Sequence, residues 1–227
     1  RHGNPLGHSF ADYRYNNDAT YFADGTETAA CEHAGCTLKD TRICKNSRLI
    51  DTGLPTAAIT IGERTWSTLV SAPVFELYHN GAQTVTIAYA DGESGLDGAW
   101  YYISDTAVSN LDAIEWKPYT AALTLDADGT YVIYAKATDK VGNAAVVCSE
   151  GLVLDTAAPQ LSVKDGDTFC EKVTVRITEK YLASVTVDGE EVTPEDGVIT
   201  LTAADKPQVI AATDKAGNKT EITVTVN

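Results

Sequence analysis

The chain has 227 residues, 44% of them hydrophobic, and its 32 acidic and 17 basic side chains give a net charge of −15 at pH 7. Such a charge argues against binding to nucleic acid and to anionic membrane surfaces, since both need patches of Lys and Arg. No apolar run approaches the roughly 18 residues of a transmembrane helix, so we expect no membrane insertion. The length allows one large domain or two to three small ones. The lack of a signal peptide predicts either a fragment of a longer chain or the mature piece of a processed one.

The first fifty residues form the first predicted domain, 1–50, and contain no alternating hydrophobic run. A unit of this size buries too little apolar surface to fold alone, so it needs a metal ion or a disulfide as a staple. His8, Cys31, Cys36 and Cys44 supply the donors of a tetrahedral zinc site, with His33 as a substitute ligand. A Cys31–Cys36 disulfide, a Cys36–Cys44 disulfide and free thiols are the alternatives.

Residues 51–156 form the second predicted domain, which is rich in β-forming residues. Strands are predicted at 84–89, 100–103, 121–125 and 131–137, where Val, Ile, Thr and Tyr recur in short runs. Asp128-Gly-Thr-Tyr131, at the start of the last of them, is typical of a tyrosine corner. In that motif the Tyr hydroxyl bonds back to the backbone a few residues upstream.

An acidic, Gly-containing loop follows the strand at 84–89 and carries Asp91, Glu93 and Asp97. Carboxylate oxygens are ligands that Ca²⁺ prefers, so this loop is a candidate calcium site. A solvated turn between two strands explains the same residues without an ion.

Trp100 and Tyr102 lie two residues apart in the predicted strand at 100–103. If Ala99, Tyr101 and Ile103 point into the core, the alternation of a strand places Trp100 and Tyr102 on the outer face. An exposed aromatic pair can stack on a sugar ring or on a partner, which makes these two the candidate ligand-binding residues. A shielded sheet edge or a contact with a neighbouring module explains the pair as well.

Residues 157–227 form the third predicted domain, in which the alternation is clearest. Val173, Val175 and Ile177 alternate with polar residues, and Asp188-Gly189 predicts a tight hairpin turn. About seven short strands with one buried face each indicate a two-sheet sandwich.

Two motifs occur twice and mark the predicted boundaries. Ala-Thr-Asp-Lys-x-Gly-Asn occurs at 137–143 and 212–218, each time between two β-rich runs, which predicts a hairpin with Gly142 and Gly217 at positive φ. The Asp of each copy can accept hydrogen bonds from the turn backbone. Asp-Thr-x-x-Pro occurs at 51–55 and 155–159, where Pro suits the start of an edge strand after a linker.

These motifs, with Gln-Thr-Val-Thr-Ile at 83–87 and Tyr-Tyr-Ile-Ser-Asp at 101–105, resemble the bacterial immunoglobulin-like repeats of large surface or secreted proteins of gut Firmicutes. The first fifty residues resemble a short Cys-containing repeat of the same proteins, although Tyr21 stands where related copies carry Cys. The resemblance implies an all-β fold, with two tandem immunoglobulin-like β-sandwiches after a small irregular Cys-containing N-terminal module. It also implies an extracellular or cell-surface location, because modules of this family are non-catalytic extensions of hydrolases, peptidases or adhesins.

The expected function is therefore that of non-catalytic accessory or spacer modules, which position the functional domain of a larger secreted or cell-surface protein. Their partners are the neighbouring domains of that protein. The alternative is a binding module for host glycan or protein. No phosphate-binding loop, nucleophile elbow or His-Glu-x-x-His motif occurs in the sequence, so we expect no enzymatic activity and no cofactor for chemistry.

Cys148 and Cys170 flank the predicted boundary between the second and third domains. A disulfide between them would clamp the two sandwiches together, provided that their Cα atoms lie close enough. The alternatives are a Cys148–Cys170 disulfide and two free thiols.

Overall fold

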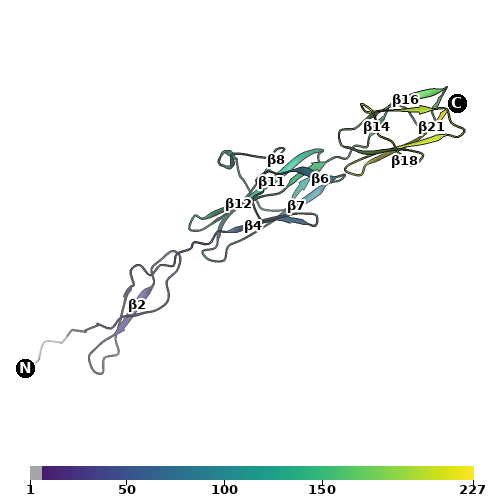
Figure 1. Ribbon diagram of the computed structural model, residues 1–227. Helices are drawn as coiled ribbons and strands as arrows, with labels where there is room; N and C mark the ends of the chain where they lie inside the picture. The colour runs from purple at the N-terminus through teal and green to yellow at the C-terminus, as the bar shows by residue number, and fades with distance from the viewer. Residues whose placement is uncertain (1–6) are drawn as a thin grey trace, which may run out of the picture. The chain divides into compact units, whose positions relative to one another are not determined.

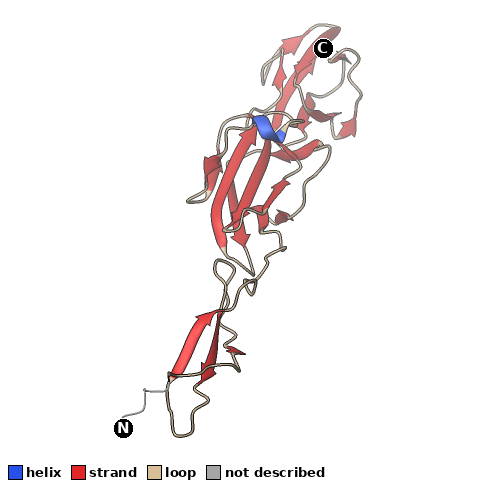
Figure 2. Ribbon diagram, turned by 90° about the vertical axis from the view of Figure 1, so that its left-hand side faces the viewer, coloured by secondary structure: helices blue, strands red, loops and turns tan. Residues whose placement is uncertain are grey.

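A computed structural model describes residues 7–227, whose regular secondary structure is almost entirely β-strand, joined by loops and turns (Figure 1). Figure 2 shows the one helical element among them in blue, the short 3₁₀ helix η1 (Leu111–Ala113). No helix in this part of the chain is both long and apolar enough to span a membrane. Residues 1–6 of the first predicted domain lie outside the described residues.

The chain divides into two compact units. One comprises residues up to Ala57 together with 89–99 and 136–145, and the other comprises 58–88, 100–135 and 146–227. The division into domains at 1–50, 51–156 and 157–227 stays a prediction.

Residues 14–43 form a small antiparallel sheet of three strands, in the order β1 (Arg14–Tyr15), β2 (Thr26–Ala30) and β3 (Lys39–Ile43). Thr28 and Thr41 face each other across β2 and β3, and their hydroxyls hydrogen-bond at 2.9 Å. Ala29 is buried, but β3 is exposed along most of its length. The sheet therefore buries little apolar surface, as the sequence predicted, and the rest of this segment is loop.

Residues 56–154 contribute two sheets. The smaller has the order β10 (Leu123–Leu125), β7 (Gln83–Ala90), β4 (Thr56–Ile61) and β5 (Arg64–Trp66). The larger has the order β6 (Phe75–His79), β13 (Gly151–Leu154), β11 (Gly129–Asp139), β8 (Leu96–Ser104) and β9 (Lys117–Pro118), with β12 (Ala144–Cys148) also paired to β11. Alternation directs Val85 and Ile87 of β7 inward and the intervening Thr86 outward.

Residues 160–226 form two further sheets around a core of their own. One has the order β14 (Gln160–Leu161), β16 (Lys172–Thr178) and β19 (Val198–Thr202). The other has the order β15 (Thr168–Phe169), β21 (Lys219–Val226), β20 (Gln208–Asp214), β17 (Leu182–Val187) and β18 (Glu190–Glu191). Both sheets supply the buried core, which includes Val173, Val175, Ile177, Val185, Ile199, Leu201, Ile210 and Val224.

The two sandwiches share one topology. In each larger sheet an edge strand runs parallel to the last strand of its sandwich, β6 with β13 and β15 with β21. The strands next to it then follow in corresponding order, β11, β8 and β9 in one sandwich and β20, β17 and β18 in the other. Packed β-sheets with this arrangement are immunoglobulin-like. The predicted all-β fold class is confirmed.

The predicted turns are present. Gly142 and Gly217 have φ of +100° and +91°, and Asp188 and Gly189 have φ of +53° and +85°, the combination that a tight two-residue hairpin requires. The Tyr131 hydroxyl donates to the Ala127 carbonyl at 2.6 Å, which confirms the tyrosine corner.

Candidate metal centres

Within the described residues, side chains able to hold a metal ion gather at three places, which are His8 with Cys31 and Cys36, Asp51 with Asp91 and Asp139, and Asp155 with Glu179 and Asp214. In each group the candidate ligand atoms lie within 4.8 Å of one another. Two oxygens on opposite sides of one Ca²⁺, each about 2.4 Å from it, are about 4.8 Å apart. Each group is thus compact enough to surround a single ion.

The first group has the geometry of a zinc centre. Cys31 directly follows β2 and Cys36 lies in the connection to β3. His8 Nδ1 is 3.6 Å from Cys31 Sγ and 3.5 Å from Cys36 Sγ. In a tetrahedral centre with Zn–S of about 2.3 Å and Zn–N of about 2.05 Å, the nitrogen and sulfur ligands lie about 3.6 Å apart. The three side chains therefore fit three positions of such a centre.

Cys31 is the acidic thiol of this group. Burial by itself would raise its pKa, but hydrogen bonds from the His33 backbone and from the Cys36 and His8 side chains lower the pKa of Cys31 to about 6. For Cys36, a backbone hydrogen bond at Leu38 lowers the pKa, while Cys31 and burial outweigh it and raise the pKa. The group thus favours one thiolate at neutral pH, and the thiolate is the form that binds metal.

Cys44 does not belong to this group, which corrects the predicted four-residue set. The Cys31 N–H donates to the Leu38 carbonyl at one end of the β2–β3 pair, whereas the Cys44 N–H donates to the Gly25 carbonyl at the other end. The five-residue strands between these ends separate them by roughly 16 Å. His33 also points elsewhere, because its Nε2 contacts the Gly7 carbonyl at 2.8 Å.

The second group joins three segments that are distant in sequence. Asp51 precedes β4, Asp91 follows β7 and Asp139 ends β11. Asp139 is only 2% exposed, and its Oδ1 accepts three backbone N–H groups of its turn, those of Val141, Gly142 and Asn143. The carboxylate that the sequence predicted as a turn acceptor thus also faces two other carboxylates.

Backbone hydrogen bonds hold the other two carboxylates in place. Asp51 accepts the Gly53 N–H through Oδ1 and the Ser94 N–H through Oδ2, each at 3.0 Å. Asp91 Oδ2 accepts the N–H groups of Glu93 and Gly95 at 3.1 and 2.6 Å. The loop from 91 to 95 therefore wraps around its own Asp and reaches the linker residue Asp51.

Glu93 lies against this group. The Ser94 side chain contributes most to lowering the pKa of Asp51, against the opposing effect of burial. A hydrogen bond with Asp51 contributes most to raising the pKa of Glu93, followed by burial and by the charges of Asp51 and Asp91. Two carboxylates in such contact need a proton or a cation between them, because like charges at this distance repel.

Calcium binding stays a prediction, and the structure brings together only part of the residues proposed for it. Asp91 and Glu93 lie where the sequence placed them, but Asp97 is exposed on β8 and does not join the group. Asp51 and Asp139, which lie close to Asp91, were not among the residues selected from the sequence. Their signal was available in the two duplicated motifs, since Asp51 and Asp155 start one motif and Asp139 and Asp214 occupy the same position of the other.

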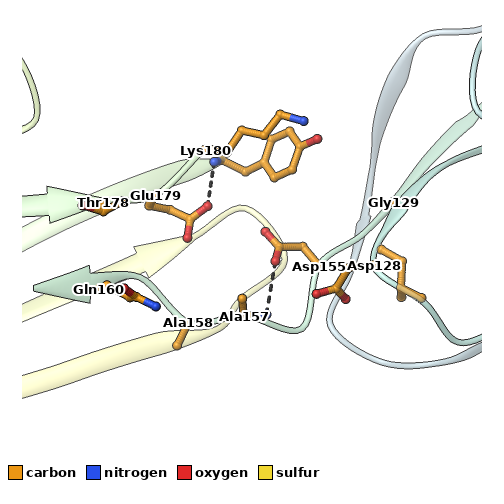
Figure 3. A pocket seen from close by; sticks show the side chains of 11 residues that line it. Asp128, Gly129, Asp155, Ala157, Ala158, Gln160, Thr178, Glu179 and Lys180 are labelled. Atoms are coloured by element: carbon orange, nitrogen blue, oxygen red, sulfur yellow. Dashed lines mark hydrogen bonds between the residues drawn. The ribbon is translucent and has the colours of Figure 1, made fainter.

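The third group is the counterpart of the second in the last sandwich. Asp155 precedes β14, Glu179 follows β16 and Asp214 ends β20. Asp155 and Glu179 line a surface pocket, and Figure 3 shows their hydrogen bonds to the backbone. Asp155 Oδ1 accepts the Ala157 N–H at 3.2 Å, and Glu179 Oε1 accepts the Tyr181 N–H at 2.8 Å.

The predicted aromatic ligand pair is not an outward-facing pair. Tyr102 packs against the buried cluster of Val132, Tyr134 and Cys148, with its ring centroid 6.4 Å from that of Tyr134. Tyr102 is therefore covered, and the expectation that it is exposed to a ligand is wrong. Trp100 is half-buried and lies opposite Pro118 of β9, and its part in ligand binding stays a prediction.

The proposed Cys148–Cys170 disulfide is absent, since both residues are free thiols. Cys148 is fully buried, and its sulfur accepts the Val70 N–H at 3.3 Å and lies 3.4 Å from the Val70 carbonyl. Cys170 is exposed in the loop between β15 and β16. No disulfide forms among the cysteines of the first segment either, so the alternatives there reduce to zinc or free thiols.

Comparison with known proteins gives no family assignment. No family model matches the chain, and no curated protein matches it significantly. Among solved structures it is similar to fibronectin(III)-like modules of Clostridium thermocellum CbhA, with 14% identity, 74% of this chain and 92% of that chain covered, and a TM-score of 0.29. It is also similar to the titin domains z1z2 in complex with telethonin, with 16% identity, coverage of 74% and 95%, and a TM-score of 0.26.

Proposed function

We propose that this chain is a set of non-catalytic β-modules that space and position the functional domain of a larger secreted or cell-surface protein. The observation that carries the proposal is a hydrogen bond from an Asn side chain to the linker, which occurs at the start of both sandwiches. Asn143 donates its side-chain amide to the Asp51 carbonyl at 3.4 Å, and Asn218 donates to the Asp155 carbonyl at 2.7 Å. In both cases the residue after the hairpin turn holds the linker that leads into the sandwich.

This hydrogen bond restricts the conformations that the linker can adopt. Each Asn amide is itself fixed by the Asp of its own turn, with Asn143 Nδ2 2.7 Å from Asp139 Oδ2 and Asn218 Nδ2 2.8 Å from Asp214 Oδ2. The linker also ends in Pro, which fixes one dihedral and restricts the residue before it. A spacer requires linkers with few free dihedrals, whereas a linker rich in Gly and Ser behaves as a flexible coil.

The N-terminal segment is proposed to be stapled by zinc through His8, Cys31 and Cys36. The fit of the sulfur–nitrogen distances to a tetrahedral centre and the lowered pKa of Cys31 support this. Zinc would have a structural role there, since the small sheet of this segment buries little apolar surface.

The bacterial, extracellular setting rests on the resemblance of the duplicated motifs to immunoglobulin-like repeats of Firmicutes surface proteins. In such a setting the partners are the neighbouring domains of the same chain. Binding of host glycan or protein is the competing function, and Trp100 is its remaining candidate residue.

Two measurements on the whole chain test this proposal. A glycan array and assays with glycan and peptide substrates should show neither saturable binding nor turnover. Limited proteolysis should spare the segments 51–55 and 155–159, and Asn218→Ala should expose the second of them selectively. Turnover that survives repurification, or equal cleavage of both linkers in parent and variant, contradicts the spacer function. Saturable binding of one glycan that is lost in Trp100→Ala would establish the competing function instead.

A further inference from the structure

We propose that Asp51, Asp91 and Asp139, together with the Ser94 hydroxyl, form a binding site for one Ca²⁺ ion. The site ties the linker before β4 to the loop between β7 and β8 and to the turn after β11. It differs from the set predicted from sequence, because Asp97 is outside it and two of its three carboxylates come from the duplicated motifs.

The first argument is distance. One carboxylate oxygen from each Asp lies within 4.8 Å of the others. Calcium takes oxygen ligands at about 2.3–2.6 Å, so three oxygens this close can all reach one ion. The backbone hydrogen bonds to Asp51 and Asp91 hold these carboxylates in place before any ion binds.

The second argument is the Ser94 hydroxyl. Ser94 is 5% exposed, and its Oγ makes no well-aligned hydrogen bond to any described residue. It nevertheless lies beside the Asp51 carboxylate, which its backbone N–H already contacts at 3.0 Å. The hydroxyl proton can turn toward Asp51, but no described donor reaches the oxygen lone pairs, and an ion in this position would satisfy them.

The third argument is uncompensated charge. Neither the ion pair of Arg42 with Glu27 nor that of Lys219 with Glu221 involves these carboxylates. The nearby Lys140 directs its ammonium group beside Gly95 and forms no ion pair with the three Asp residues within the described chain. Glu93 adds a further carboxylate in contact with Asp51. A divalent cation is the species that this concentration of negative charge would attract.

The donor set selects the type of cation. All four donors are oxygens, and no His or Cys belongs to the group, which disfavours zinc. Magnesium demands near-ideal octahedral geometry and retains several waters, whereas calcium accepts six to eight oxygens in irregular arrangements. The three carboxylates come from three separate loops rather than from one preformed octahedral motif, which suits calcium better.

The trio of Asp155, Glu179 and Asp214 occupies corresponding positions in the last sandwich, but none of the described residues there supplies a buried, unpartnered hydroxyl. The proposal is therefore confined to the first trio. The second trio supplies a matched control, because it offers similar carboxylates without the Ser94 hydroxyl.

The test is a calorimetric titration of the complete, metal-depleted chain with calcium chloride at neutral pH. The parent should bind Ca²⁺ saturably. Asp51→Asn removes a charged ligand and should weaken binding about tenfold or more, since ligand charge tunes the affinity of calcium sites. Ser94→Ala retains every backbone hydrogen bond and should also weaken binding, which keeps the test valid if Asp51→Asn fails to fold.

Three controls accompany the titration. Asp97→Asn makes the same change of charge outside the group and should leave the affinity unchanged, as should Asp155→Asn. His8→Ala should also leave it unchanged, because it removes a donor only from the zinc-type group. The proposal is wrong if the parent shows no saturable binding, if Asp51→Asn and Asp97→Asn have equal effects, or if binding is lost in Asp155→Asn and kept in Asp51→Asn.

Discussion

Asn218 donates its side-chain amide to the backbone carbonyl of Asp155, 63 positions earlier in the chain, over 2.7 Å. Asn143 makes the corresponding contact to Asp51 at 3.4 Å. The two duplicated motifs of the sequence are thus the two halves of one structural device, in which a hairpin turn holds the linker that precedes its own sandwich. The same pair of contacts therefore fixes the linker at the start of each sandwich.

The first prediction concerns this device. Asn218→Ala removes the bonds to Asp155 and to the Asp214 carboxylate, and should destabilise the last sandwich by about 1–2 kcal/mol, since each hydrogen bond contributes about 1 kcal/mol net. Urea unfolding measures the loss. Lys206→Ala, at an exposed site in the same sandwich, should be neutral. Equal unfolding midpoints for the two variants would show that the hydrogen bonds of Asn218 do not stabilise the last sandwich.

The second prediction concerns Gly151, which starts β13 and lies opposite Phe75 of β6. A Cβ at Gly151 would lie 2.6 Å from the Phe75 ring, so Gly151→Ala forces the ring or the strand to move. We expect a loss of about 1–3 kcal/mol, as for other overpacked sites. Gly81→Ala is the matched control, because nothing lies within 4 Å of its Cβ position. A thermal melt in which both variants behave alike would refute the predicted clash.

The third prediction concerns the tyrosine corner. Tyr131→Phe loses the bond to the Ala127 carbonyl and should cost about 0.5–1.5 kcal/mol at neutral pH. Burial and the charges of Asp126 and Asp128 raise the pKa of Tyr131. Above about pH 10 the unfolded chain therefore loses this proton first, and the folded parent loses stability as the pH rises.

Tyr131→Phe lacks this proton, so the difference in stability between parent and variant should narrow above about pH 10. Chemical denaturation at a series of pH values measures it. A difference that stays constant or widens would mean that the hydroxyl does not titrate in this way.

The fourth prediction separates the cysteines of the N-terminal segment. Cys31→Ser and Cys36→Ser should abolish stoichiometric zinc and expose residues 8–45 to protease, because each removes a sulfur from the group around His8. Cys44→Ser should retain both zinc and protection, since Cys44 lies at the other end of β2 and β3. Elemental analysis and limited proteolysis provide the measurements. Retention of zinc in all three variants, or its absence from the parent, would exclude this centre.

The fifth prediction concerns the two remaining thiols. Under native conditions Cys170 should react rapidly with an alkylating reagent and Cys148 slowly, because Cys170 is exposed and burial raises the pKa of Cys148. After unfolding without reductant, both should be alkylated. A peptide map that finds Cys148 and Cys170 joined would contradict the free thiols of the structure.

Much of the fold could be predicted from the sequence, because strands and turns depend on residues a few positions apart. The alternation of Val173, Val175 and Ile177 predicted β16, and Asp-Gly at 188–189 predicted the hairpin of β17 and β18. The facing of Tyr102 could not be predicted in this way. Seven consecutive residues of β8, from Gly98 to Ser104, are half-buried, because side chains from distant segments cover Tyr102 as well as Tyr101.

The convergence of carboxylates was decided only by the tertiary structure. Asp97 is six residues from Asp91 in sequence but lies outside its group, because β8 has already begun and carries Asp97 away on an exposed position. Asp51 and Asp139 join Asp91 from distant segments, because the topology of the sandwich brings the start of β4, the β7–β8 loop and the β11–β12 turn together. Spacing along the chain determines local structure, whereas a site shared by three loops depends on strand order, which no single stretch of sequence contains.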